Sequence, residues 1–188
     1  MERVAVEAGP NLSFKQKVLN AKAGEVLALT FTNPDVVPHN WALLKPGTLQ
    51  KVGAEANALI SDPEALARQY IPAGGDVIVY TDVVLPGEKF TIHFQAPKEK
   101  GRYPFVCTFP GHWQRMRGVM IVVKDMDAYL AQAPAEPEAP TITEWKLADF
   151  EADLSKPLTQ RNLVKGRELF TSVGCIGCHQ IGKDGTAY

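Results

Sequence analysis

The sequence is poor in cysteine and histidine, and it lacks both long apolar runs and clusters of one charge. Its three cysteines are too few, and odd in number, for the paired framework that stabilises small secreted domains. No apolar run approaches the ~20 residues that span a bilayer. A net charge of −1 without a Lys/Arg cluster gives no electrostatic reason to expect nucleic acid as a partner. These absences leave an ordinary globular protein, which the 45% hydrophobic content also indicates.

The amino terminus shows no secretory signal, because Met1-Glu2-Arg3 leads directly into an alternating segment. We therefore expect either a cytosolic protein or a processed or excised piece of a longer one. At 188 residues, the chain has room for one ordinary domain and a small second one.

Apolar and polar residues alternate along most of the first 128 positions, which is typical of half-buried strands. Leu27, Leu29 and Phe31 share one side of such a strand, and we expect that side in the core. Turn signals separate the alternating segments at fairly even spacing. The pattern predicts an all-β fold, an antiparallel sandwich of about eight strands that includes residues 3–8, 14–20, 25–33, 77–82, 88–96, 101–108 and 118–124.

Three stretches depart from this alternation and predict helices. Residues 49–70 change period, and Ser61-Asp62-Pro63-Glu64 resembles a helix start, so we expect one short helix after residue 62 and a second before Ile60. Residues 125–132 predict a short closing helix, and residues 160–171 predict a C-terminal one.

The segment CTFPGHWQRM places a thiolate, an imidazole and a thioether at intervals of five and four residues. Soft sulfur ligands with imidazole suit copper, and a trigonal His₂Cys set with a long axial methionine is the blue-copper arrangement. The second histidine must come from elsewhere, and His39 in DVVPHNW is the candidate. Four histidines in the chain are too few for a multinuclear copper cluster. The sequence therefore predicts one type 1 copper held by His39, Cys107, His112 and Met116.

Simpler interpretations of these residue types stay open. A buried cysteine is often an inert small hydrophobe, and a lone histidine is usually structural. Met120 is a rival axial ligand, although it lies in a strand-like run. His93 falls on the polar side of its strand, where exposure is a simpler expectation than metal binding.

The motifs HNW and CTFPGH, with a methionine four residues after the latter, resemble azurin within the cupredoxin (type 1 blue copper) family over roughly residues 1–128. This resemblance implies a Greek-key β-sandwich that carries electrons and is not an enzyme. It also implies hydrogen bonds near the thiolate from Asn40 and from the backbone N–H of Phe109, contacts of the kind that tune a metal site.

Two features depart from the azurin pattern. Pro38 stands where azurins have a glycine whose carbonyl approaches copper. Its carbonyl remains available for a weak fifth contact, although proline fixes φ and restricts the residue before it. The N-terminal disulfide of azurins is missing, because no cysteine precedes Cys107.

A redox protein is the expected partner, and apolar surface beside the metal would let it approach closely. We expect Trp113, next to a predicted ligand, to form a docking patch with Val36 and Val37. The alternative is that Trp113 lies in the core.

A second motif, CIGCH, contains Cys175, Cys178 and His179 and has the CxxCH pattern of c-type haem attachment. Two thioethers would hold the haem, and His179 would be the proximal iron ligand. Residues 160–188 resemble the start of a class I cytochrome c domain. A thioredoxin-like dithiol or part of a zinc site are alternatives, but no βαβ pattern or spare fourth ligand accompanies the motif.

The haem segment ends early, because neither Met nor His follows His179. We therefore expect a truncated piece of a longer polypeptide, in which haem is uncertain. The predicted domains are a cupredoxin domain (1–130), a Pro/Ala/Glu-rich linker (131–158) and a truncated cytochrome segment (159–188). By resemblance, both modules imply a periplasmic or other extracytoplasmic location.

The predicted function is electron transfer through copper, relayed to or from a c-type haem in the same parent polypeptide. The alternative is an electron-exporting tail of a larger dehydrogenase or other redox enzyme, although no nucleophile–base pair or cofactor loop is evident. Copper storage or sensing is a weaker alternative, since it predicts more Met and His ligands.

Overall fold

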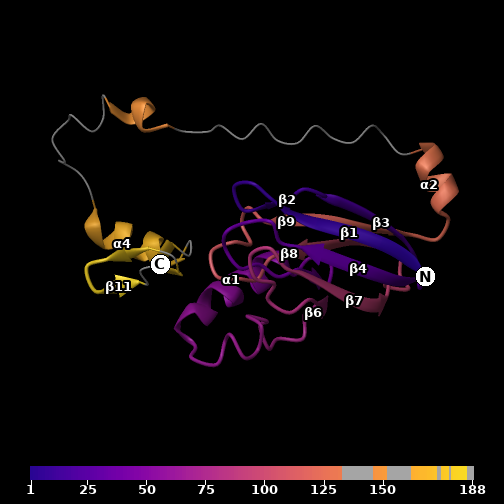
Figure 1. Ribbon diagram of the computed structural model, residues 1–188, viewed down its shortest axis with the longest axis horizontal. Coiled ribbons are helices and arrows are strands. Elements are labelled where there is room, and N and C mark those ends of the chain that lie inside the picture. Colours follow the sequence, from indigo (N-terminus) through magenta and orange to yellow (C-terminus); the bar gives the residue numbers. More distant parts are fainter. Residues whose placement is uncertain (133–145, 152–161, 173–174, 178, 186–188) are drawn as a thin grey trace.

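The computed structural model describes residues 1–132, 146–151, 162–172, 175–177 and 179–185. Two β-sheets face each other, and helix α1 (Leu49–Ala58) lies at one end of this sandwich (Figure 1). No helix within these ranges is long and apolar enough to cross a membrane.

The first sheet has the strand order β2-β1-β4-β7. Its strands are Glu2–Gly9 (β1), Ser13–Phe14 (β2), Val26–Thr32 (β4) and Lys89–Gln95 (β7). The alternation along β4 has the predicted consequence, because Leu27, Leu29 and Phe31 are each 0% exposed. Register is fixed by this pattern, since a slip of one residue would turn all three side chains outward.

The second sheet has the order β3-β9-β8-β5-β6. Its strands are Val18–Lys22 (β3), Ala42–Leu44 (β5), Val77–Tyr80 (β6), Gly101–Val106 (β8) and Arg117–Val123 (β9). Strand β5 was not predicted from the sequence, because its three residues are all buried and show no alternation of apolar and polar side chains.

The prediction of a purely antiparallel sandwich was wrong at two strand pairs. β1 pairs with β4, and β3 pairs with β9, in parallel. The cause is that β3 belongs to the opposite sheet, so the chain leaves the first sheet after β2 and returns to it at β4 in the same direction as β1. The all-β sandwich itself is confirmed.

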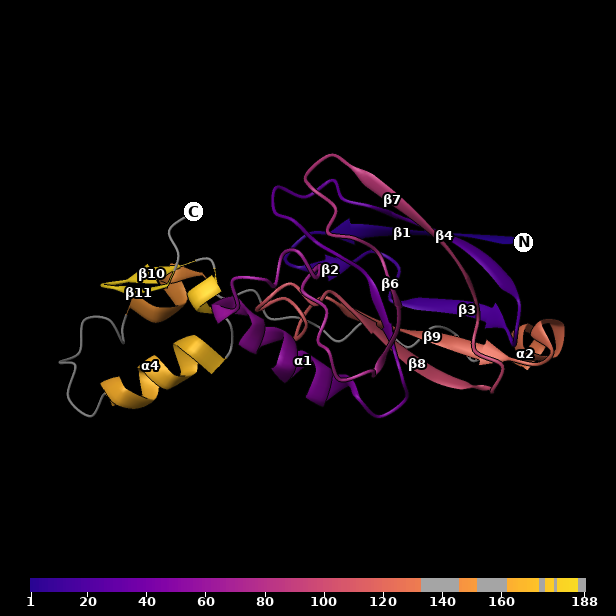
Figure 2. The same ribbon diagram turned by 90° about the horizontal axis from the view of Figure 1, so that it is seen from below.

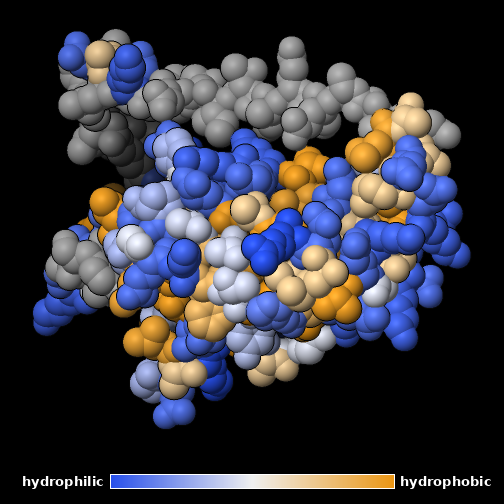
Figure 3. Space-filling view, turned by 45° about the vertical axis from the view of Figure 1, so that its right-hand side comes forward, coloured by the Kyte–Doolittle hydropathy of each residue, from blue (hydrophilic) through white to orange (hydrophobic). Residues whose placement is uncertain are grey.

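Aromatic side chains from both sheets fill the space between them. Phe14 makes edge contacts with Phe31 at 5.8 Å and with Phe105 at 5.3 Å between ring centroids, and Trp41 lies 5.6 Å from Phe105. All four side chains are 0–1% exposed. On the face shown in Figure 3, hydrophilic side chains predominate and hydrophobic ones form small groups.

Two helices were predicted between β5 and β6, and only the one before Ile60 forms. Helix α1 and the 3₁₀ turn Leu59–Ser61 (η1) occupy the stretch before residue 62. The predicted helix after residue 62 is wrong, since residues 63–70 form consecutive turns. Gln69 and Tyr70 have φ angles of 57° and 56°, and two successive left-handed residues end any helical path.

The closing helix forms as predicted at Met126–Gln132 (α2), and the C-terminal one at Leu163–Ser172 (α4). Short elements complete the described C-terminal part: Leu147–Phe150 (η2), Cys175–Gly177 (η3), Gln180–Ile181 (β10) and Asp184–Gly185 (β11). These elements lie on the α1 side of the sandwich in both ribbon views (Figures 1 and 2). Most of the predicted linker falls outside the described residues.

Candidate metal centre

Three predicted ligands meet at one end of the sandwich. Cys107 follows directly after β8, His112 lies in the loop that leads to β9, and His39 lies in the connection between β4 and β5. Two backbone hydrogen bonds with Val84 fix the His39 position, at 3.2 Å and 2.7 Å. His39 and Cys107, 68 positions apart in the sequence, thus lie side by side because each is held near the end of a strand.

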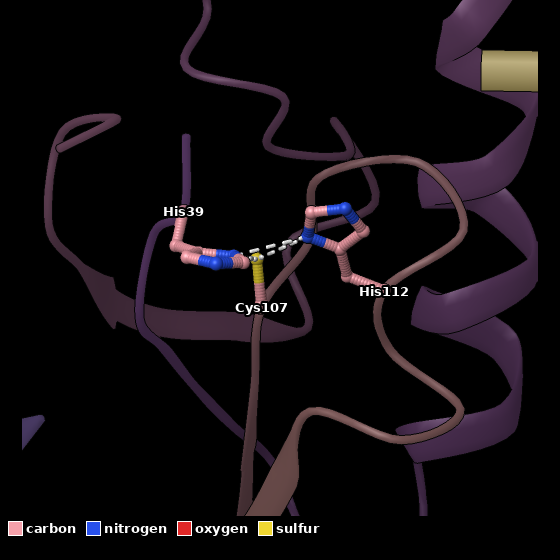
Figure 4. Close-up of side chains that lie close together, drawn as sticks. All are labelled: His39, Cys107 and His112. Atoms are coloured by element: carbon pink, nitrogen blue, oxygen red, sulfur yellow. Dashed lines mark hydrogen bonds between the residues drawn. The ribbon is translucent and has the colours of Figure 1, made fainter. Parts of the chain in front are cut away.

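The donor atoms of these three residues face one another (Figure 4). The two histidine Nδ1 atoms are 3.1 Å apart, and Cys107 Sγ lies 3.5 Å from His112 Nδ1 and 3.8 Å from His39 Nδ1. Metal bonds of about 2.0 Å to nitrogen and about 2.3 Å to sulfur separate the corners of a trigonal set by about 3.4–3.8 Å. The two sulfur–nitrogen distances fall in this range, and the nitrogen–nitrogen distance of 3.1 Å is slightly shorter, so a metal ion at the centre would move the two imidazoles a little apart.

Among the described residues, these three are the cluster of His, Cys, Asp and Glu side chains suited to a metal. His39 and Cys107 are 0% exposed and His112 is 3% exposed. Nitrogen and thiolate sulfur together favour copper over the oxygen-seeking cations. His93 lies on an exposed stretch of β7 and takes no part.

Burial dominates the protonation of the metal-free site. It raises the pKa of the Cys107 thiol to about 12, although the backbone N–H groups of Asn40 and Phe109 partly offset this effect. It lowers the pKa of His112 to about 3, helped by the nearby His39. The metal-free protein therefore holds a thiol and neutral imidazoles at neutral pH, and binding of a cation must displace the thiol proton.

Asp35 is a partner of His39 that the sequence analysis missed. Its carboxylate lies 3.1 Å from His39 Nε2, so the ring donates that N–H and leaves Nδ1 free to bind a metal. Burial lowers the pKa of His39, and Asp35 opposes this effect. The available signal was an acid four residues before a candidate ligand histidine, Asp35 in DVVPH.

Two asparagine side chains hold the backbone around the site. Asn40 accepts the Thr108 N–H and donates to Thr108 Oγ1, both at 2.8 Å, which ties the His39 segment to the Cys107 loop. Asn33 donates to the carbonyls of Val37 and Val84 at 2.9 Å and 2.8 Å. Both side chains are fully buried, and three of the four bonds are shielded from water, while the bond to the half-buried Val37 is partly shielded.

The two methionine candidates occupy different places. Met116 is fully buried in the ligand loop, where its carbonyl accepts the Cys107 N–H at 3.0 Å and its N–H donates to the His112 carbonyl at 2.8 Å. Met120 lies within β9, paired with Leu19 and Tyr103. Met116 is thus part of the same closed loop as two of the candidate ligands.

The prediction that Trp113 forms a docking patch was wrong. Trp113 is 6% exposed and packs in a cluster with Ala42, Leu44, Val52 and Val106. Helix α1 covers it, which the sequence did not reveal because the helix precedes it by about 60 residues. Val36 is 85% exposed, while Val37 and Pro38 are half-buried beside His39.

The CxxCH motif lies in the C-terminal part, away from this cluster. Cys175 and His179 are exposed, the His179 N–H donates to the Cys175 carbonyl at 2.9 Å, and Cys178 lies outside the described residues. Cys175 borders a hollow of about 800 Å³ with a mostly apolar wall. Leu163, Leu169 and Ile181 on this wall are 50–82% exposed.

Comparisons with known proteins agree with a copper site at the three candidate ligands. Auracyanin-A of Chloroflexus aurantiacus is 31% identical over 116 residues, which are 61% of this chain and 69% of that protein. Azurin of Pseudomonas chlororaphis is 27% identical, over 64% of this chain and 97% of its own length.

The solved structure of auracyanin A, described as a "blue" copper protein from a green thermophilic photosynthetic bacterium, superposes with a TM-score of 0.58. It covers 64% of this chain and 98% of that one, at 31% identity. The copper-binding plastocyanin/azurin family matches residues 2–123. The chain therefore belongs to the plastocyanin/azurin family of copper-binding proteins, and it is a blue copper electron-transfer protein rather than an enzyme.

Proposed function

We propose that His39, Cys107 and His112 hold one type 1 copper ion through their Nδ1, Sγ and Nδ1 atoms, with Met116 as a weak axial ligand. The carrying observation is the mutual spacing of the three donor atoms, 3.1 Å, 3.5 Å and 3.8 Å, in a site closed to solvent. When bound, the copper supplies a one-electron couple, Cu(II)/Cu(I).

The protein's part is to keep the ligand positions the same in both oxidation states. Asn40, Asn33 and Asp35 bind the segments that carry the ligands by buried or half-buried hydrogen bonds, so these side chains do not rearrange when the charge changes. A fixed donor set lowers the reorganisation that accompanies each electron transfer. Electrostatic support from the N–H groups of Asn40 and Phe109 favours the thiolate.

Met116 is the preferred axial ligand because the loop that it closes also carries Cys107 and His112. Pro38 is half-buried next to His39, and its carbonyl is the proposed second axial neighbour. A redox protein would approach near the exposed Val36 and the half-buried Val37, which lie on the His39 side of the site.

The CxxCH segment supports a wider proposal, in which residues 1–130 form the copper module, 131–158 a linker and 159–188 part of a c-type haem module. Cys175 borders the apolar hollow, whose exposed Leu163, Leu169 and Ile181 would otherwise be unfavourably hydrated. A flat apolar group held through Cys175 and Cys178, with His179 as its iron ligand, would cover these side chains. Such a relay belongs in an extracytoplasmic compartment.

The relay predicts an internal electron-transfer step in the protein loaded with copper and haem. Stopped-flow reduction should show fast reduction of one centre and a slower equalisation whose rate does not depend on protein concentration, because the two centres share one chain. The double variant Cys175→Ala, Cys178→Ala is the control, since it cannot attach haem but keeps the copper ligands. Independent reduction of the two centres, with no first-order phase between them, would contradict the relay.

A further inference from the structure

Helix α1 contacts the ligand loop on both sides of His112. On one side, the Gly111 N–H donates to Asn57 Oδ1 at 2.8 Å. On the other, Trp113 packs against Gly53, where a Cβ atom would meet the indole ring at 2.2–2.5 Å. The two residues that flank a candidate copper ligand thus both contact one helix.

An asparagine at position 57 lowers the stability of the fold unless its buried amide is hydrogen-bonded. It is only 9% exposed, and it lies in the last turn of α1 rather than at a cap, where an amide side chain has no intrinsic advantage. A buried amide is tolerated when its groups are hydrogen-bonded, and here both ends are used. The oxygen holds Gly111, and Nδ2 donates to the Ser172 carbonyl at 3.0 Å.

The second contact reaches the C-terminal part of the chain. Ser172 is the last residue of α4 and stands three positions before Cys175 of the CxxCH motif. Both ribbon views place α4 on the same side of the sandwich as α1 (Figures 1 and 2). One side chain therefore contacts the loop of His112 and the segment that precedes Cys175.

We propose that Asn57 is a positioning residue that fixes His112 through Gly111 and joins the copper-ligand loop to the C-terminal segment. The inference rests on the proposed role of His112 as a ligand. Gly53 assists, because its missing side chain lets Trp113 approach the helix. A covalent and hydrogen-bonded path then runs from His112 through Gly111, Asn57 and Ser172 toward Cys175.

Two substitutions separate the two contacts. Asn57→Ala removes both, whereas Asn57→Asp keeps an acceptor for the Gly111 N–H but has no N–H to donate to Ser172. Gln50→Ala is the matched control, since Gln50 is an exposed amide on the same helix. The first measurements use the metal-free full chain, so they do not depend on whether copper or haem binds.

Hydrogen exchange at the Gly111 amide tests the loop contact. We expect about tenfold faster exchange in Asn57→Ala, the effect of losing one buried hydrogen bond, and near-normal exchange in Asn57→Asp and Gln50→Ala. Equal exchange in Asn57→Ala and Gln50→Ala would overturn this half of the proposal.

Nitrogen-15 relaxation of the α4 amides tests the junction. In the unchanged chain, α4 should share the rotational correlation time of the sandwich. In both Asn57 variants, the correlation time of α4 alone should become shorter. An α4 that already tumbles independently in the unchanged chain would overturn the junction.

The copper-loaded protein supplies the readout that a merely structural role would leave unchanged. Asn57→Ala should shift the blue absorption band and the copper hyperfine splitting, because His112 changes its orientation, while Gln50→Ala should change neither. Gly53→Ala should shift the same signals through Trp113. An unchanged spectrum in both variants would contradict positioning, whereas a colourless unchanged protein would refute the proposed function instead.

Discussion

Replacement of Cys107 by serine should abolish the intense blue absorption of the copper-loaded protein. The band requires a thiolate bonded to Cu(II), and a serine hydroxyl is a hard, protonated oxygen that does not replace it. The two side chains are nearly equal in size, and Cys107 is fully buried against the core, so the sandwich should still fold.

The matched control for this substitution is Cys175→Ser. Cys175 is exposed and lies in the C-terminal part, outside the three-residue cluster. This variant should keep the full blue band at one copper per chain. If Cys107→Ser stayed blue, or if Cys175→Ser lost the colour, the assignment of the thiolate ligand to Cys107 would be wrong.

Acidification should begin to destabilise the metal-free protein near pH 6.5, above the range in which carboxylates titrate. Burial lowers the pKa of His112 from its ordinary value of 6.5 to about 3 in the folded state. Below pH 6.5 the unfolded chain therefore binds a proton at His112 that the folded protein does not bind. The contribution of the neutral His112 to the free energy of unfolding is fully present above pH 6.5 and falls as the pH decreases toward 3. At pH 4.5, two units below the unfolded value, the loss from His112 is about 2–3 kcal/mol.

Urea unfolding of the metal-free chain at pH 7 and pH 4.5 measures this loss. His112→Gln should remove about 2–3 kcal/mol of the pH dependence, and His93→Gln, which changes an exposed histidine, should leave it intact. His39 adds to the effect in the same direction, since burial lowers its pKa as well. Asp35, Asp62 and Asp76 have lowered pKa values and titrate below this window. A stability that is flat between pH 7 and 4.5 would contradict the burial of neutral histidines.

The strands that could be predicted from sequence are those that carry their own signal. Leu27, Leu29 and Phe31 are buried because alternation is a local property, and Cys107, His112 and Met116 lie together because one short loop contains them. His39 was assigned from ligand chemistry, which demands a second imidazole, and the structure places its Nδ1 3.8 Å from Cys107 Sγ.

Apart from the helix wrongly predicted after residue 62, a local error, the main errors concern contacts that no single segment encodes. Trp113 is buried because Gly53, 60 positions earlier, leaves room for its ring on α1, and no local pattern encodes that approach. The parallel pairs depend on which sheet β3 joins, which alternation does not specify. The pairing of Asp35 with His39 needed the turn that Asn33 shapes through its own side chain.

Titration of the metal-free full chain with Cu(II), followed by absorption and electron paramagnetic resonance, tests the central claim most directly. The preset His39, Cys107 and His112 donors should give an intense blue band that grows linearly and stops at one copper per chain, with the small hyperfine splitting of a copper–thiolate bond. A colourless or pale complex with ordinary hyperfine splitting, or a band that saturates at another stoichiometry, would contradict the claim.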